Sequence, residues 1–227
     1  PMITSVSSSI ADGLYKIGEQ IAIEVTVNES VVVTGTPQLT LETGSTDAVV
    51  NYSSGSGSNT LVFNYTIASG DINSDLEYQS TSALALNGGT IKDASGNAST
   101  ITLPTLGTAN SLAGNKALVV DGVVPTFMQP PLTSIVNNNT YIDIVLTEAV
   151  YNASAGSGAL EVADFTLTFA QNSGNATGAS ISSVKQNDNV AEGSASALAG
   201  GEIVIRAFLS ITGTPSGVET ITITPVN

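Results

Sequence analysis

The sequence predicts an all-β protein, and three observations lead to that fold class. Apolar and polar residues alternate with a period of two in many short runs, as they do in strands with one buried face. Turn signals rich in Gly, Ser and Asn separate these runs about every ten residues, which is the spacing typical of β-sandwiches. No segment shows the periodicity of a helix. We therefore expect strands throughout.

The expected strands can be followed from the amino terminus. Two runs show the alternation most clearly, each with four apolar residues on one face: Ile21, Ile23, Val25 and Val27 in the first, and Leu61, Phe63, Tyr65 and Ile67 in the second. The other expected strands have the same character and cover residues near 3–10 and residues 37–43, 47–53, 82–86, 99–103, 116–120, 141–146, 164–169, 201–211 and 219–224.

Two observations divide the chain into domains of residues 1–121 and 122–227. One strand ends at Asp121, and the pattern begins again after Pro125, as expected of a short stiff connector. The two halves also have similar sequence patterns, which align Glu29 with Glu148 and suggest tandem copies of one module. The second half ends without the loop and closing strand that complete the first. We expect either a second domain truncated at its carboxyl terminus, within a longer array, or one that closes differently from the first.

Composition and charge argue against several classes of function. Nineteen acidic residues face five basic ones, giving a net charge of −14, which argues against binding to nucleic acid or to an anionic membrane surface. The absence of His and Cys removes the usual zinc ligands, the Ser-His and Cys-His nucleophile pairs, and every disulfide. Oxygen ligands remain, and they favour calcium. No apolar run reaches the roughly 18 residues that a membrane span needs.

Several stretches of the first domain carry a resemblance to a known family. They read DGLYKIGEQIAIEVTVNE, GTPQLTLETG, NYSSGSGSNTLVFNY, SGDINSDLEY, LNGGTIKDASGNA and VVDGVVP. Together they resemble the tandem immunoglobulin-like repeats of very large bacterial surface proteins and adhesins. The match covers essentially all of the first domain, and the second only through TEAVY and GSGALEVADFTLTF.

The resemblance implies an all-β fold of two tandem immunoglobulin-like β-sandwich domains. Such repeats act as extender units that hold a binding domain away from the cell, and many are stiffened by calcium at the joints. It implies an extracellular or cell-surface location, neighbouring repeats as partners, and an adhesive protein whose target is a glycan or another protein. We expect the chain to be monomeric.

The stretch SGDINSDLEY at residues 69–78 raises the question of a metal site, because oxygen-bearing side chains stand at every second position. An EF-hand that began at Asp71 would need Gly at its sixth position and Glu at its twelfth, where this chain has Leu76 and Ser82. The stretch is therefore not an EF-hand. Another interpretation is an acidic turn in which Asp75 caps the next segment and Tyr78 anchors a sandwich corner.

Immunoglobulin strand order gives the acidic residues a second role. With alternate loops at opposite ends, the loops after the first and fifth strands lie at the end from which the chain leaves the first domain. Asp12, Asp71, Asp75 and Asp121 would then meet Glu148 of the second domain. A bound Ca²⁺ takes 6–8 oxygen ligands and offsets the repulsion among such carboxylates. We therefore expect a calcium site at the joint, which would favour one orientation of the two domains.

Other acidic loops give weaker signals. By the same strand order, Glu29 lies at the entry end of the first domain, where it would serve a joint with a preceding module. Asp93 and Asn97 are more simply explained by a hairpin turn than by a metal loop. Asp188 and Glu192 are expected in a solvated loop.

Catalysis is one alternative function that the sequence disfavours. Paired carboxylates can hydrolyse glycosides, but the catalytic acid needs an apolar and usually aromatic cleft. The chain has no Trp, its aromatic content is 5%, and Arg206 is the sole arginine available to clamp a charged substrate. We therefore expect no enzymatic activity.

A carbohydrate-binding module of a secreted polysaccharide-active protein is the stronger alternative. Such modules are often calcium-bearing β-sandwiches that stack sugars on exposed aromatic rings. Tyr65, Tyr78 and Tyr141 fit core or corner positions, which leaves Tyr52 and Tyr151 for stacking. This is a thin basis for a glycan platform, so a structural segment is the favoured interpretation.

Overall fold

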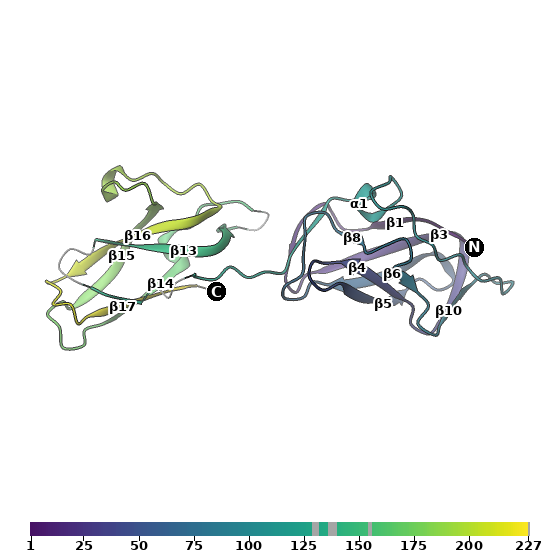
Figure 1. The fold of residues 1–227 in the computed structure, drawn as a ribbon, viewed down its shortest axis with the longest axis horizontal. Coiled ribbons are helices and arrows are strands. Elements are labelled where there is room, and N and C mark those ends of the chain that lie inside the picture. Colours follow the sequence, from purple (N-terminus) through teal and green to yellow (C-terminus); the bar gives the residue numbers. More distant parts are fainter. Residues whose placement is uncertain (129–131, 136–139, 154–155, 227) are drawn as a thin grey trace. The chain divides into compact units, whose positions relative to one another are not determined.

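A computed structural model describes residues 1–128, 132–135, 140–153 and 156–226. The structure is mostly β, with several antiparallel sheets and one short α-helix, α1 (Leu112–Asn115), among the described residues (Figure 1). The all-β class expected from the sequence is confirmed at this level. The chain divides into two compact units, Pro1–Val124 (unit 1) and Pro125–Asn227 (unit 2). No helix in the described part is long and apolar enough to cross a membrane.

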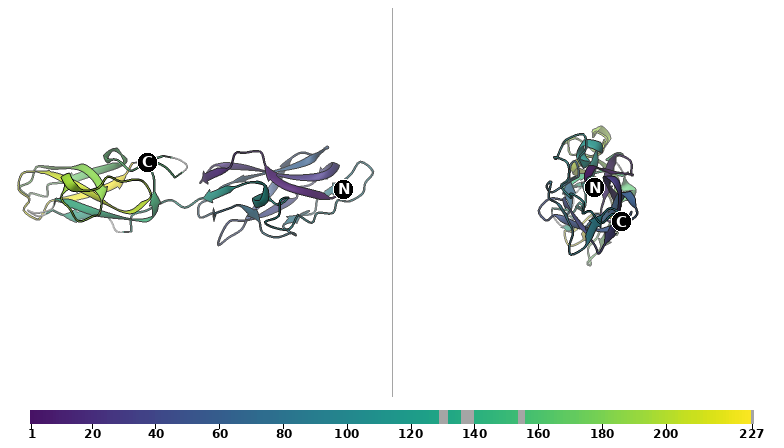
Figure 2. Two further views of the ribbon diagram at one scale, coloured as in Figure 1. Left: turned by 90° about the horizontal axis from the view of Figure 1, so that it is seen from above. Right: turned by 90° about the vertical axis from the view of Figure 1, so that its right-hand side faces the viewer.

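The main sheet of unit 1 has eight strands. Along its path lie β1 (Ile3–Ser8), β3 (Gln20–Thr34), β6 (Ser58–Thr66), β5 (Ala48–Ser54), β4 (Gln38–Glu42) and β8 (Glu77–Tyr78), while β10 (Thr90–Lys92) pairs with β3 and β9 (Leu84–Ala85) pairs with β4. All these pairings are antiparallel. In Figures 1 and 2 the strands run along the length of the unit, and loops gather at its two ends.

Strand β5 changes its partner half-way along. Its first part pairs with β4, from Leu41↔Ala48 to Gln38↔Asn51, and its second part pairs with β6 at Tyr52↔Phe63. This exchange curls the sheet, so that apolar residues of β4 and of β3 pack in one core. β5 and β6 separate on one side of the Tyr52–Phe63 pair, where residues before Tyr52 in β5 and after Phe63 in β6 are not paired with each other.

A smaller sheet of unit 1 joins segments that are far apart in the sequence. Its strands are β2 (Gly13–Lys16), β11 (Leu118–Asp121) and β7 (Ile72–Asn73). β11 runs parallel to β2, from Leu118↔Gly13 to Asp121↔Lys16, and antiparallel to β7. Within the described residues, β2–β11 is the one parallel strand pair, apart from an isolated bridge.

Unit 2 contains two three-stranded antiparallel sheets. One has β12 (Leu132–Ser134), β17 (Thr220–Pro225) and β14 (Phe165–Ala170), and the other has β13 (Tyr141–Val150), β16 (Glu202–Thr212) and β15 (Gly178–Gln186). Two short 3₁₀ turns, Val162–Asp164 and Glu192–Ser194, lie between strands. Ile223 of the first sheet and Ile144, Ile205 and Ala207 of the second belong to one core, which is separate from that of unit 1.

Three local expectations were wrong. Residues 99–103 form no strand. Thr100 makes one isolated bridge with Met2, while Ser99 and Leu103 donate backbone hydrogen bonds to Ile91 and Thr81, so the alternation there reflects burial and not a continuous strand. The short helix α1 was missed because its four residues are too few to show a helical period. Strand β15 was missed because a register shift between Ile181 and Ser183 interrupts the alternation.

Candidate functional site

The acidic stretch of residues 69–78 begins with a carboxylate that has a structural task. The Asp71 Oδ2 atom accepts hydrogen bonds from the Tyr65 hydroxyl at 2.7 Å and from the backbone N–H of Ala68 at 2.9 Å. Burial, and then the hydrogen bond to Asp71, raise the pKa of Tyr65, so the phenol stays protonated and continues to donate. Asp71 thus closes the loop that follows β6.

The four acidic residues assigned to unit 1 lie near the two ends of β11, two at each end, with Asp12 and Asp75 in segments on opposite sides of this strand. Asp71 is close to Asp121, because the backbone N–H of Gly122 donates to the Asp71 carbonyl at 2.6 Å. Asp12 and Asp75 lie near the other end of β11. The Asp12 carboxylate accepts from the N–H of Ala117 at 3.1 Å, and the residue after Asp75 donates its N–H to Leu118 at 2.8 Å. The two ends of this strand are about 10 Å apart at 3.3 Å per residue.

Asp12 also makes an ion pair. Its Oδ1 atom lies 3.1 Å from the Lys116 ammonium group. The hydrogen bond from Ala117 and the neighbouring Lys116 together lower the pKa of Asp12, so the carboxylate is charged at neutral pH. The Asp12 side chain is exposed, although that of Lys116 is partly buried, so the pair contributes little to stability. A metal ion at Asp12 would have to compete with Lys116.

Glu148, the fifth residue of the expected calcium site, belongs to β13 in unit 2. It lies where the β13–β16 register is irregular, between Val145 and Val150. Among the described residues, no three acidic side chains gather closely enough to hold a metal ion. The five-residue site at the joint stays a prediction from the sequence.

The other end of the acidic stretch builds the corner of unit 1. Tyr78 is fully buried, and its hydroxyl donates to the Pro104 carbonyl. Beside it, the buried Glu77 carboxylate accepts backbone hydrogen bonds from Gly107, Leu112 and Ala113 at 3.2–3.3 Å. Glu77 therefore holds the segment that includes α1, a role that its place in an alternating acidic run did not reveal.

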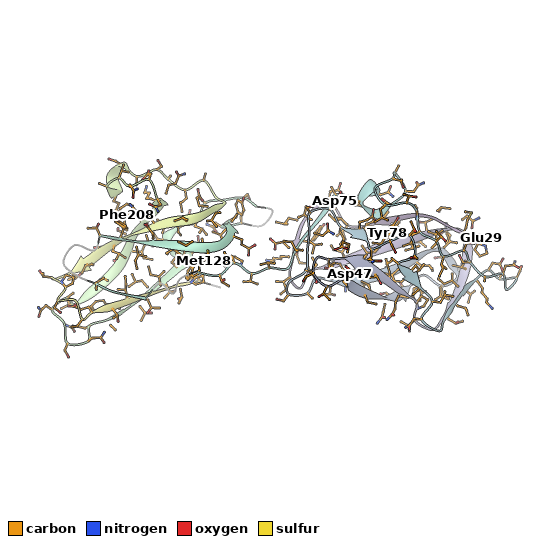
Figure 3. All side chains as sticks on the ribbon, viewed as in Figure 1. Glu29, Asp47, Asp75, Tyr78, Met128 and Phe208 are labelled. Atoms are coloured by element: carbon orange, nitrogen blue, oxygen red, sulfur yellow. The ribbon has the colours of Figure 1, made fainter. Side chains whose placement is uncertain are left out.

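Two weaker sequence signals can also be placed. The Asp93 carboxylate accepts hydrogen bonds from the N–H groups of Ser95 and Asn97 and from the Asn97 side chain, which is the geometry of a closed turn. In Figure 3, Glu29 lies at the opposite end of unit 1 from Asp47 and Asp75.

A polar groove opens in unit 1 where β5 and β6 separate. Its volume is about 560 Å³. The lining includes the side chains of Asp47, Val49, Asn51, Asn64, Thr66 and Asp71. It contains no Lys or Arg. Sequence reasoning did not single out Asp47, because a lone acid before a strand has no distinguishing spacing.

Unit 2 has a second hollow, of about 480 Å³, beside its single arginine. Arg206 is buried and donates to both carboxylate oxygens of Asp143, at 2.7 and 2.9 Å. It also donates to the side chains of Asn187 and Asn189, and its guanidinium carbon lies 3.7 Å from the centre of the Tyr141 ring. These contacts give Arg206 a structural role in that sheet.

The tyrosines do not form a stacking platform. Tyr52 is half-buried, packs edge-on against Phe63 and accepts a hydrogen bond from the N–H of Ser56. Tyr141 and Tyr151 are each 41% exposed, but they are far apart: Tyr141 begins the ten-residue strand β13, and Tyr151 follows its last residue. Tyr141 was expected in the core; instead it covers Arg206 on the outer face of its sheet.

Comparison of the chain with known protein families, with curated proteins and with solved structures gave no match. The function of the chain is therefore inferred from its own residues and their geometry.

Proposed function

We propose that this chain is a non-catalytic extender segment of a bacterial cell-surface or secreted adhesin-like protein, built from two immunoglobulin-like β-sandwich modules. The observation that carries the proposal is the tandem of two compact β units, each with its own apolar core. The residues that connect them, 122–126, belong to no helix or strand. A spacer needs modules that fold by themselves and can be repeated.

The acidic side chains support a structural role. Those of Asp71, Glu77 and Asp93 accept hydrogen bonds that close loops or hold segments of unit 1. Calcium remains the cofactor that we propose, with Asp12, Asp71, Asp75, Asp121 and Glu148 as the residues to test. Its support is the charge balance of the sequence and the preference of Ca²⁺ for oxygen ligands.

Small-angle scattering of the purified chain tests the extender role, and thermal unfolding in calcium or in chelator tests the metal. We expect an elongated particle in both conditions and a melting temperature that rises by several degrees in calcium, since a ligand that binds only the folded state stabilises it. A compact, folded-over particle would contradict the extender role. Identical melting curves would contradict calcium and leave the extender role standing.

The alternative, a carbohydrate-binding module built on a stacking platform, lacks the coplanar exposed tyrosines that it needs. The polar groove of unit 1 is a different kind of feature, since Asp and Asn side chains line it.

A further inference from the structure

The groove of unit 1 exists because the first part of β5 pairs with β4 and its second part pairs with β6. The backbone N–H of Tyr52 donates to Pro37, beside β4, at 2.8 Å. In an antiparallel pair alternate residues turn their backbone groups to opposite sides, so Val49 turns its N–H and C=O away from β4 and toward β6. These two groups open into the groove.

The opposite wall of the groove, formed by β6, also turns backbone groups toward the groove. Ile67, just after β6, donates its N–H to Glu19 at the start of β3. By the same alternation, Thr66 turns its N–H and C=O away from β3 and toward β5. The groove is thus bounded on both sides by backbone donors and acceptors of strand edges, beyond the point where β5 and β6 stop pairing.

Polar side chains add to these backbone groups. Asn51 and Asn64 line the two walls. The Asn51 oxygen accepts from the Gln38 amide at 2.9 Å, which leaves its NH₂ group to donate, and the Asn64 amide can both donate and accept. Asp47 is half-buried, and no hydrogen bond or ion pair engages its carboxylate among the residues that the structure describes. Asp71 uses one oxygen for Tyr65 and Ala68. Val49, which is 58% exposed, supplies an apolar surface beside these groups.

We propose that this groove binds a neutral saccharide, with Asp47, Asn51 and Asn64 as the groups that recognise its hydroxyls. A sugar hydroxyl both donates and accepts, which fits walls that offer carboxylate acceptors, amides and free backbone groups. Its C–H face can cover Val49. Two carboxylates and no basic residue in the lining disfavour an anionic sugar. The volume lies in the range of known small-ligand sites.

The first experiment exposes the full chain to an array of immobilised neutral oligosaccharides and their uronic-acid and sialylated counterparts. We expect retention of at least one neutral class and no anionic glycan. Failure to retain any neutral glycan, or equal retention of anionic ones, would overturn the proposal. Neither result affects the extender role, which rests on scattering.

The second experiment locates the binding. Titration of the retained oligosaccharide into isotope-labelled protein should shift backbone resonances of residues 47–51 and 64–66. Asp47→Ala and Asn64→Ala should each weaken binding by about tenfold or more, because each removes a hydrogen-bonding partner of the sugar. Asp47→Asn, which keeps the size and loses the charge, should weaken it less than Asp47→Ala.

The matched control is Glu24→Ala, which removes a partly exposed carboxylate outside the groove lining. It should leave the affinity unchanged, and all variants should unfold at the temperature of the parent protein. Equal weakening by Glu24→Ala would overturn the assignment to the groove. Calcium chloride alone, if it shifted the same resonances and displaced the sugar, would show that the groove is a metal site instead.

Discussion

At the scale of single residues, two buried glutamate carboxylates each accept hydrogen bonds from several backbone N–H groups. Glu77 does this in unit 1, and Glu219 does it in unit 2. Glu219 is fully buried and accepts from the N–H groups of Ala176, Ser216 and Gly217 at 2.8–3.1 Å. Gly174 makes room for it, because a Cβ there would lie 2.1 Å from the Glu219 carboxyl carbon. Glu77 holds the segment that includes α1, and Glu219 holds a loop that has no regular secondary structure to fix it.

The pKa of Glu219 gives unit 2 a defined acid sensitivity. Burial raises this pKa, but the hydrogen bonds outweigh burial and bring it down to about 2, from an ordinary value of 4.5. The stabilisation is therefore complete above pH 4.5 and is lost as the pH falls toward 2. In Glu219→Gln, we expect a lower stability of unit 2 at pH 7 and a flatter dependence between these limits.

Amide resonances of unit 2, followed through urea unfolding at several pH values, measure this effect. Asp75→Asn, a change at an exposed carboxylate of unit 1, should leave the pH profile of unit 2 as it is. A Glu219→Gln profile as steep as that of the parent protein would show that other carboxylates control the acid response.

At the scale of elements, residues 187–198 form a strap over the outer face of the β13–β16–β15 sheet. Arg206 holds its beginning through Asn187 and Asn189, and Glu192 accepts hydrogen bonds from Ser182 and Ser183 of β15. Asp188 and Glu192 lie in a mostly exposed loop, as expected, but they are not idle in it. Their carboxylates accept hydrogen bonds within the unit, and these lower both pKa values.

Removal of Arg206 should loosen this strap. Arg206→Met leaves Asp143 without its partner, and we expect a loss of roughly 2 kcal/mol, less than for a fully buried pair because Asp143 is partly exposed. Arg206→Lys keeps the charge but not the two-pronged geometry, so it should lose about half as much. Hydrogen exchange should accelerate in residues 187–198 and stay slow in β17.

Lys185→Met is the control for this experiment, because Lys185 is the cross-strand neighbour of Arg206 and carries the same charge. Its charge is the smallest of the causes that lower the pKa of Glu192, so Lys185→Met should speed the exchange of the strap far less than Arg206→Met does. Equal acceleration in both variants would mean that charge in general, and not the Arg206 contacts, holds the strap.

At the scale of the whole molecule, strands with a buried face could be predicted from the sequence. Features that depend on which segments pair with each other could not. Strands β3 and β6 were predicted correctly because one face of each lies in the core, and a strand with one buried face alternates apolar and polar residues. The exchange of partners by β5 was not predictable, because residues 47–54 alternate in the same way beside β4 and beside β6. The groove, which arises from that exchange, was missed for the same reason.

The candidate site shows a similar division. The acidic run of residues 69–78 was recognised as unusual, and the role of Tyr78 as a corner agrees with its buried contact to Pro104. The roles of its carboxylates depend on groups far away in the sequence, such as Leu112 for Glu77 and Gly122 near Asp71. Spacing along one strand contains no information about such neighbours.

The parallel pairing of β2 with β11 has a mechanical consequence. Once a load on the two ends of unit 1 has detached β1 from β3, it draws β2 toward its amino end and β11 toward its carboxyl end. The β2–β11 hydrogen bonds are then loaded in shear and must break together. We expect a single high force peak for unit 1 in single-molecule pulling experiments. Val119→Pro in β11 removes a backbone donor and should lower that peak, whereas an unchanged peak would place the resistance elsewhere. In a spacer under tension, this four-residue pairing would set the load at which the first unit yields.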